Sequence, residues 1–172
     1  MSLSWTFALA NNLKIDLEAA AWKKFPGVCP YCGRRPCDPL CNSKERPEKL
    51  RTDLTVARLD HGSFHDFQCM LSQVYPNNES RTSAGHSFEE LAEAVQAIDF
   101  GLGRHEQQDF ELIVSEIVDV IAHICAVASC EQIDLATEMA KKFGNGCPRC
   151  HYLECRCNFT TDVAPPIRGP EA

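Results

Sequence analysis

Four carboxylates stand in two pairs in the most helix-like part of the chain. Glu90 and Glu93 form the first pair, and Glu116 and Asp119 form the second. Residues three positions apart lie on one face of a helix, so each pair directs its oxygens to one side. Oxygen ligands grouped in this way could hold a divalent metal ion. The four residues are therefore candidate metal ligands.

The surroundings of the second pair predict that it is buried. In residues 110–128 the only charged side chains are Glu111, Glu116 and Asp119, and many of the others are isoleucine or valine. Buried carboxylates are costly unless a positive charge compensates them, and residues 105–140 contain no lysine or arginine. A divalent metal ion bound between two facing helices would supply the positive charge that these carboxylates need. The alternative, a solvated helix face, fits Glu89 and Glu93 better than the second pair.

Eight of the eleven cysteines fall in two tight clusters, each of which begins Cys-Pro-X-Cys. They are Cys29, Cys32, Cys37 and Cys41, then Cys147, Cys150, Cys155 and Cys157. In a reducing compartment such spacing predicts thiolate ligands for zinc, the alternative being a disulfide framework in an exported protein. Four thiolates leave no open position, so we expect a structural zinc. The clusters could close two separate sites, which eight thiolates favour, or share one.

Each cluster ends one copy of a repeated segment. Ile-Asp-Leu, Lys-Lys-Phe and Cys-Pro-X-Cys follow one another at residues 15–32 and, in the same register, at residues 133–150. Each copy predicts a short helix with an acidic start and a basic end, which runs into a cysteine knuckle.

The elements that must position these residues are all helices, because apolar residues recur at helical spacing and no stretch alternates with a period of two. We expect helices over about 3–25 (interrupted near Asn11 and Asn12), 63–75, 87–100, 109–128 and 133–143. Ser87 is the predicted N-cap of the third, with Glu90 completing a capping box after a polar loop at 77–85. Residues 101–108 are a predicted loop, and the tail after Cys157 is predicted to be flexible.

Composition sets the frame for these motifs. The chain has 172 residues, of which 44% are hydrophobic and 24% charged, as in an ordinary folded domain. A net charge of −7 argues against broad binding to nucleic acid or to an anionic membrane. Lacking a long uncharged apolar stretch and a clear signal peptide, the chain is expected to be cytoplasmic, with no membrane partner.

The order of these motifs resembles a known family. Glu89-Glu90-Leu91-Ala92-Glu93 followed by Glu116-Ile117-Val118-Asp119 is similar to the carboxylate signature of the MazG-like all-α nucleoside triphosphate pyrophosphohydrolases. Residues 64–68 and 74–76 resemble the family's first helix, and residues 133–145 resemble its fourth. The resemblance covers about half of the chain, and ordinary members lack the cysteine knuckles and the N-terminal copy.

The resemblance implies a fold and an activity. We expect a bundle of about four core helices plus an N-terminal helix and two zinc knuckles. The expected division is 1–60 for the N-terminal helix and first knuckle, 61–145 for the catalytic core and 146–172 for the second knuckle and tail. The implied reaction is magnesium-dependent hydrolysis of a nucleoside triphosphate to a monophosphate and pyrophosphate, in a homodimer or homotetramer.

The resemblance also implies roles for single residues. Glu90, Glu93, Glu116 and Asp119 would bind magnesium, and Glu89 would orient or deprotonate water. Lys141 would contact phosphate, and Asn145 phosphate or sugar. Because the N-terminal copy carries no carboxylate pair and has Gly27 where the other copy has Asn145, only the C-terminal copy is expected to contribute to catalysis. Activity is accordingly expected to survive Cys32→Ser.

A rival interpretation is a zinc-stabilised binding module on a non-catalytic bundle. Small zinc knuckles grip single-stranded nucleic acid through basic and aromatic residues, and such residues flank both clusters. They include Tyr31, Arg34 and Arg35 at the first cluster. Nearby Asp38 and Glu154 and the acidic total weaken this interpretation. A salt-dependent gel shift with single-stranded RNA or DNA would support it.

Overall fold

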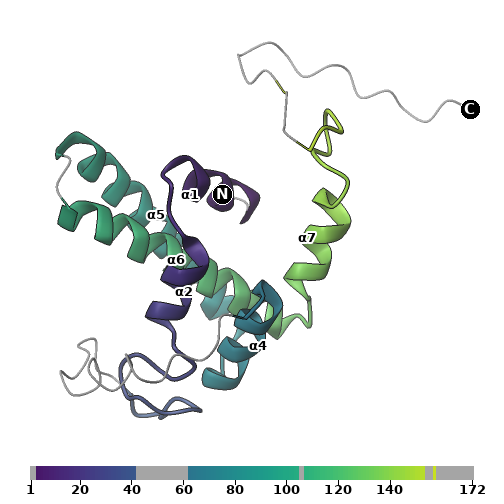
Figure 1. Cartoon of the computed structure of the whole chain (residues 1–172). Helices are drawn as coiled ribbons and strands as arrows, with labels where there is room; N and C mark the ends of the chain where they lie inside the picture. The colour runs from purple at the N-terminus through teal and green to yellow at the C-terminus, as the bar shows by residue number, and fades with distance from the viewer. Residues whose placement is uncertain (1–2, 42–61, 105–106, 154–156, 158–172) are drawn as a thin grey trace, which may run out of the picture. The chain divides into compact units, whose positions relative to one another are not determined.

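Two long helices lie side by side in the larger part of the chain (Figure 1). They are α5 (Ser80–Arg104) and α6 (Gln107–Cys130). The computed structural model describes residues 3–41, 62–104, 107–153 and 157, which form six helices and no strand. For these residues the predicted all-α class is confirmed.

Helix α6 carries most of the core. Ile113, Ile117 and Val118 are at most 1% exposed, and α5 buries the small side chains of Ala94 and Ala97. Burial of branched apolar side chains is the main favourable term in folding, so this run fixes which side of α6 faces inward. The half-buried carboxylates of α6 lie in this same apolar helix.

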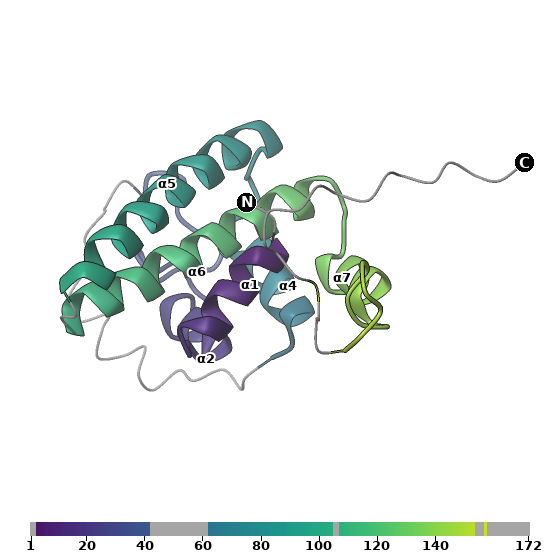
Figure 2. The same ribbon diagram turned by 90° about the horizontal axis from the view of Figure 1, so that it is seen from above.

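Three shorter helices pack against α6 (Figure 2). They are α1 (Leu3–Asn12), α2 (Leu17–Lys24) and α4 (Phe64–Val74). The ring of Phe67 on α4 meets Trp22 and Phe25 edge-to-face, at centroid distances of 5.5 and 6.3 Å. Edge-to-face pairs add to the stability gained by burial, so these aromatic rings help to hold α2 on the bundle.

The helix boundaries agree with the sequence in part. The break after Asn12 and the helix beginning after Ser63 are confirmed, and Ser63 forms a capping box with Asp66. The predicted N-cap at Ser87 is wrong, because α5 already begins at Ser80. Ser83, in the first turn of α5, is only 4% exposed, so the buried part of the helix begins before Ser87. The Ser87 hydroxyl donates to the Ala84 carbonyl (2.7 Å), as the hydroxyl groups of serines inside helices do.

The predicted loop at 101–108 is also wrong over most of its length. α5 continues to Arg104 and α6 begins at Gln107, so the two glycines at 101 and 103 lie in helix. Glycine weakens a helix but does not forbid it. The predicted flexible tail lies outside the described residues, apart from Cys157 itself.

The sequence repeat is also a repeat of backbone structure. The turn after α1 and the turn after α6 use the same hydrogen bonds: Ile15 N–H to Ala10 O (2.9 Å) and Ile133 N–H to Ala128 O (2.8 Å). Each turn contains one residue with a left-handed backbone, Lys14 (φ 58°) or Gln132 (φ 57°). Helices commonly end in this way, with a residue in the left-handed conformation and a hydrogen bond from the next N–H group back to a carbonyl of the helix. The repeated unit thus includes the end of the preceding helix.

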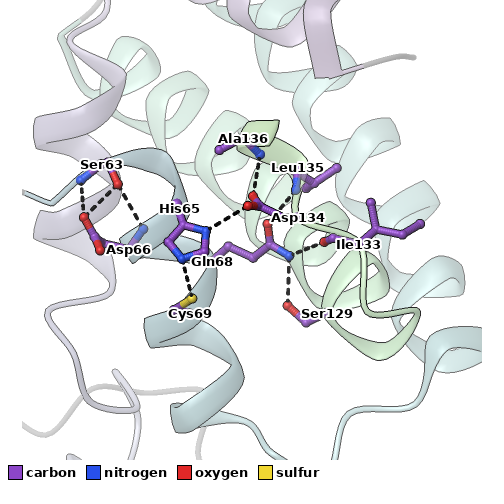
Figure 3. A network of polar contacts seen from close by, with 10 residues as sticks. All are labelled: Ser63, His65, Asp66, Gln68, Cys69, Ser129, Ile133, Asp134, Leu135 and Ala136. Carbon is purple, nitrogen blue, oxygen red and sulfur yellow. Dashed lines mark hydrogen bonds and ion pairs between the residues drawn. The ribbon is translucent and has the colours of Figure 1, made fainter. Parts of the chain in front are cut away.

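The turn between α6 and α7 (Leu135–Phe143) is fastened to α4 by one buried glutamine (Figure 3). Gln68 is 6% exposed, and its Nε2 donates to Ile133 O (2.7 Å) and Ser129 Oγ (3.3 Å). Its Oε1 accepts from Leu135 N–H (3.0 Å). Beside it, His65 Nδ1 lies 3.2 Å from Asp134 Oδ2, whose other oxygen accepts from Ala136 N–H. These bonds satisfy polar groups that burial would otherwise penalise.

The chain divides into two compact units, Met1–Ala136 and Thr137–Ala172. The first contains α1, α2, α4, α5, α6 and the first cysteine cluster. The second contains most of α7 and the second cluster, and no residue of α7 is buried. The predicted domain boundaries near residues 60 and 145 stay a prediction.

One helix of the described residues would be long and apolar enough to cross a membrane. This stretch, Phe110–Cys130, has a mean hydropathy of 1.9, and 44% of its apolar window is buried inside the protein. Core helices of soluble proteins have the same length and composition, so the stretch is a weak indication of a membrane span.

We expect Gln68→Ala to destabilise the protein by about 1–3 kcal/mol, because it leaves Ile133 O and Leu135 N–H without their buried partner. The exposed Gln73 on the same helix is the matched control, and Gln73→Ala should change the free energy of unfolding by less than about 0.5 kcal/mol. Urea unfolding measures both. Equal effects of the two substitutions would contradict the structural role of Gln68.

Candidate functional site

Three of the four predicted metal ligands converge between α5 and α6. One oxygen each from Glu90, Glu116 and Asp119 lie within 4.8 Å of one another, and all three side chains are partly buried. The helices α5 and α6 run in opposite directions, so Glu90 on the first comes level with Asp119 on the second. The three carboxylates form a group that could hold a metal ion.

The other two predicted carboxylates occupy different positions. Glu93 is exposed and lies close enough for its charge to raise the pKa of both Glu90 and Glu116. Glu89 is exposed, and its Oε2 lies 2.8 Å from His86 Nδ1. The structure therefore places Glu93 beside the three converging carboxylates, while Glu89 is paired with a histidine on its own helix.

Burial and mutual repulsion disfavour ionisation of these groups. Burial first, and then the charges of Asp119, Glu93 and Glu116, raise the pKa of Glu90 to about 7. Burial also raises the pKa of Asp119, more than the adjacent Lys24 lowers it. A group of carboxylates that repel one another and are only partly solvated is an electrostatic setting in which a cation is strongly stabilised.

Lys24, at the last turn of α2, supplies a positive charge that sequence analysis missed. Its Nζ forms an ion pair with Asp119 Oδ2 and donates to Ser115 Oγ (2.7 Å) and Ser115 O (3.2 Å). Its charge lowers the pKa of Glu90, Glu116 and Asp119. The N-terminal copy of the repeat thus reaches the carboxylates, although it carries none of its own.

Two histidines border the carboxylates along the same helices. His123 Nε2 lies 3.6 Å from Glu90 Oε1, and the rings of His86 and His123 are 5.5 Å apart. Burial, and then the charge of His86, lower the pKa of His123.

The first cysteine cluster has the dimensions of a metal site. The sulfurs of Cys29, Cys32, Cys37 and Cys41 all lie within 4.8 Å of one another. Cys29 and Cys41 are 4.0 Å apart, and Cys32 and Cys37 3.9 Å. Four sulfurs at about 2.3 Å from one zinc ion would be about 3.8 Å apart, whereas a disulfide needs about 2.05 Å. The four thiols could therefore hold a metal such as zinc.

The second cluster repeats this arrangement in the second unit. Cys147, Cys150 and Cys157 lie within 4.8 Å of one another, and Cys147 and Cys157 are 3.8 Å apart. Cys155 lies outside the described residues. Since each cluster gathers its own sulfurs, the geometry favours separate metal sites over one shared site.

The two knuckles also share one backbone fold. Cys29 N–H donates to Arg34 O and Cys147 N–H donates to Tyr152 O, each at 2.9 Å. The tight turn inside each loop needs a left-handed residue, which is Gly33 (φ 68°) in one copy and His151 (φ 59°) in the other. His151 therefore has a backbone role at the position that glycine fills in the first copy.

The first cysteine cluster lies close to the carboxylates. Burial first, and then the charges of Asp119 and Glu90, raise the pKa of Tyr31, which is part of the knuckle. The thiolates of Cys29 and Cys41 contribute to the same shift. Tyr31 is therefore near both the first cysteine cluster and the carboxylates, all of which belong to the first unit.

Lys141 and Asn145, the predicted phosphate and sugar contacts, belong to the second unit. Both are exposed, and Lys141 Nζ donates to Glu138 Oε1 (2.6 Å) on its own helix. The carboxylates belong to the first unit. The predicted contact of Lys141 and Asn145 with substrate stays a prediction.

Comparisons with known proteins give no assignment. No family model matches the chain, and no curated protein and no solved structure matches it either. What the chain does has to be argued from the site itself.

We expect the free energy of unfolding of the magnesium-free protein to fall as the pH rises from about 4.5 to about 7. Over this window Glu90 ionises in the unfolded chain but stays protonated in the folded one, where its pKa is raised to about 7. Because solvent partly screens this partly exposed carboxyl group, the loss is about 1–2 kcal/mol. Denaturant titrations at several pH values measure it.

Glu90→Gln should remove most of this slope, while Glu111→Gln, an exposed glutamate on α6, should preserve it. An unchanged slope in Glu90→Gln would show that Glu90 is not the group responsible.

We expect the protein purified under reducing conditions to carry about two zinc ions per chain. Cys32→Ser should lower the zinc content by about one ion per chain, because it removes one thiolate of the first cluster. Cys69, an isolated cysteine on α4, is the control, and Cys69→Ser should not change the content. Atomic emission measures the metal, and equal zinc contents in all three proteins would rule out a zinc site at Cys32.

Proposed function

We propose that the protein is a magnesium-dependent nucleoside triphosphate pyrophosphohydrolase of the MazG-like all-α type. The observation that carries this proposal is the convergence of Glu90, Glu116 and Asp119 on α5 and α6. Their carboxylate oxygens are the ligand type that magnesium prefers, and their mutual repulsion calls for a cation. The resemblance to the MazG-like family assigns these three residues, together with Glu93, to magnesium.

The net negative charge of the carboxylate group supports the binding of a divalent metal ion and, with it, an anionic substrate. Among the described residues, Glu90, Glu93, Glu116 and Asp119 influence one another, and Lys24 is the lysine that offsets them. One lysine against four carboxylates leaves an excess of negative charge when all are ionised. A magnesium ion reduces this excess, and further ions would make the site attractive to a triphosphate.

The reaction consumes one water molecule. The water oxygen bonds to phosphorus at the α–β anhydride, the bridging P–O bond breaks, and monophosphate and pyrophosphate leave. Magnesium, when bound, supplies the positive charge that neutralises the phosphates and activates water for attack. The role of Glu90, Glu116 and Asp119 is to hold that charge, with Glu93 at the exposed side of the group.

Glu89 remains the proposed group that orients or deprotonates the water. His86 Nδ1 lies 2.8 Å from Glu89 Oε2, and this contact restricts the rotamers of Glu89. A base restrained in this way is better placed for proton transfer than a freely moving surface side chain. The cysteine clusters hold structural zinc in this proposal, because four thiolates leave no position for substrate.

We expect purified protein to release pyrophosphate from one or more nucleoside triphosphates only when magnesium is added. Glu116→Gln should lower kcat/KM by about a hundredfold or more, because it removes a charged ligand from the metal. Glu111→Gln, on the exposed side of the same helix, is the matched control and should retain activity within about twofold. A panel of canonical and modified triphosphates, read as monophosphate and pyrophosphate, makes the measurement.

Absence of cleavage of every triphosphate by protein with intact helices and full zinc content would refute the proposed activity. Equal activity of Glu116→Gln and Glu111→Gln would refute the carboxylate site as its location.

A further inference from the structure

Lys24 is built into the carboxylate site by a segment that is far away in sequence. Its Nζ contacts Asp119 and Ser115 on α6, 95 and 91 positions further along the chain. The Lys24 side chain keeps 26% of its surface exposed.

The backbone that carries Lys24 is held at several points. α2 ends with Phe25 N–H donating to Ala21 O (2.9 Å), and Trp22 Nε1 donates to Gly62 O (3.3 Å). Phe25 is buried, as are the residues at positions 26 and 27. The last turn of α2 therefore has little freedom to move away from α6.

The first cysteine cluster continues directly from this buried segment. Cys29 is fully buried, only five positions after Lys24, and Cys37 N–H donates to the carbonyl of Val74 at the end of α4 (2.7 Å). The cluster thus joins the end of α2 to the end of α4. A metal ion bound by its four sulfurs would restrict both, since a closed tetrahedral site restrains every chain segment that contributes a ligand.

We propose that Lys24 is a phosphate-contacting residue of the carboxylate site, held in place by the metal ion that the first cysteine cluster binds. The inference rests on the proposed function. When metal engages the carboxylates, Lys24 Nζ exchanges its contact with Asp119 for one with a phosphate oxygen. The N-terminal repeat copy then contributes to catalysis, contrary to the expectation from sequence, and Cys32→Ser impairs the enzyme.

Lys23 provides a matched control for the test. It neighbours Lys24 on α2, has the same charge and is exposed. We expect Lys24→Met to lower kcat/KM by about tenfold to a hundredfold, the usual effect of losing one hydrogen bond to a charged group. Lys23→Met should stay within about twofold, and Lys24→Arg should recover part of the activity because it retains the charge.

A binding measurement separates phosphate contact from support of Asp119. Calorimetry with inorganic pyrophosphate at saturating magnesium should show about tenfold or greater weakening in Lys24→Met and none in Lys23→Met. If Lys24 only neutralises Asp119, Lys24→Met changes stability and magnesium affinity but leaves pyrophosphate affinity unchanged, and the inference is overturned. Far-UV circular dichroism and the unfolding midpoint verify that the variants are folded.

The link to the cysteine cluster is tested by a double-mutant cycle on the full chain. Cys32→Ser should reduce zinc content and pyrophosphate affinity, and adding Lys24→Met should cause little further loss of affinity. Additive losses would show that the cluster does not act through Lys24, whereas Cys69→Ser should affect neither quantity.

Wild-type activity is read first, so the two failures can be told apart. If the wild type cleaves no triphosphate, the proposed function fails. If it cleaves one and Lys24→Met behaves like Lys23→Met, only the present inference fails.

Discussion

Repulsion among carboxylates at a partly buried helix interface is the constraint on which the rest of this structure depends. Glu90, Glu116 and Asp119 cannot all be ionised there without compensation, because each is deprived of solvent and faces the others. Lys24 compensates part of this charge. The α5 and α6 helices supply the frame, since they pack against each other and bury their alanine and isoleucine side chains.

This constraint explains why an N-terminal helix is part of the core unit. α2 is short, and alone it would be only marginally helical in water. It is stabilised by the aromatic contacts of Trp22 and Phe25 with Phe67, by its Asp16 cap and by the cysteine knuckle that follows it. All of these features place Lys24 at the carboxylates.

The sequence predicted the local features well and the long-range ones poorly. The paired carboxylates, the cysteine clusters and the helix that begins after Ser63 are all encoded within a few residues. The structure confirms that helix and gathers three of the four carboxylates and the described cysteines of each cluster. The start of α5 was missed because Ser83 and its neighbours are polar, and only tertiary packing decides that Ser83 is buried. The contact between Lys24 and Asp119 joins residues 95 positions apart, and no local sequence pattern predicts it.

The repeat could have pointed to that contact. Both copies place two lysines at the end of a short helix, shortly before a cysteine knuckle, and the resemblance implies phosphate contact for Lys141 of the C-terminal copy alone. The N-terminal copy has no carboxylates of its own, so the sequence predicts no catalytic role for it. A basic residue need not share a helix with the acids that it serves, since it is the fold that brings them together. The same backbone turns precede both copies, so the same local physics presents a lysine at the end of each helix. In the N-terminal copy the described structure shows which acid that lysine meets, and the first knuckle follows the lysine closely in sequence, which is why we propose that the knuckle supports the site as well as the chain.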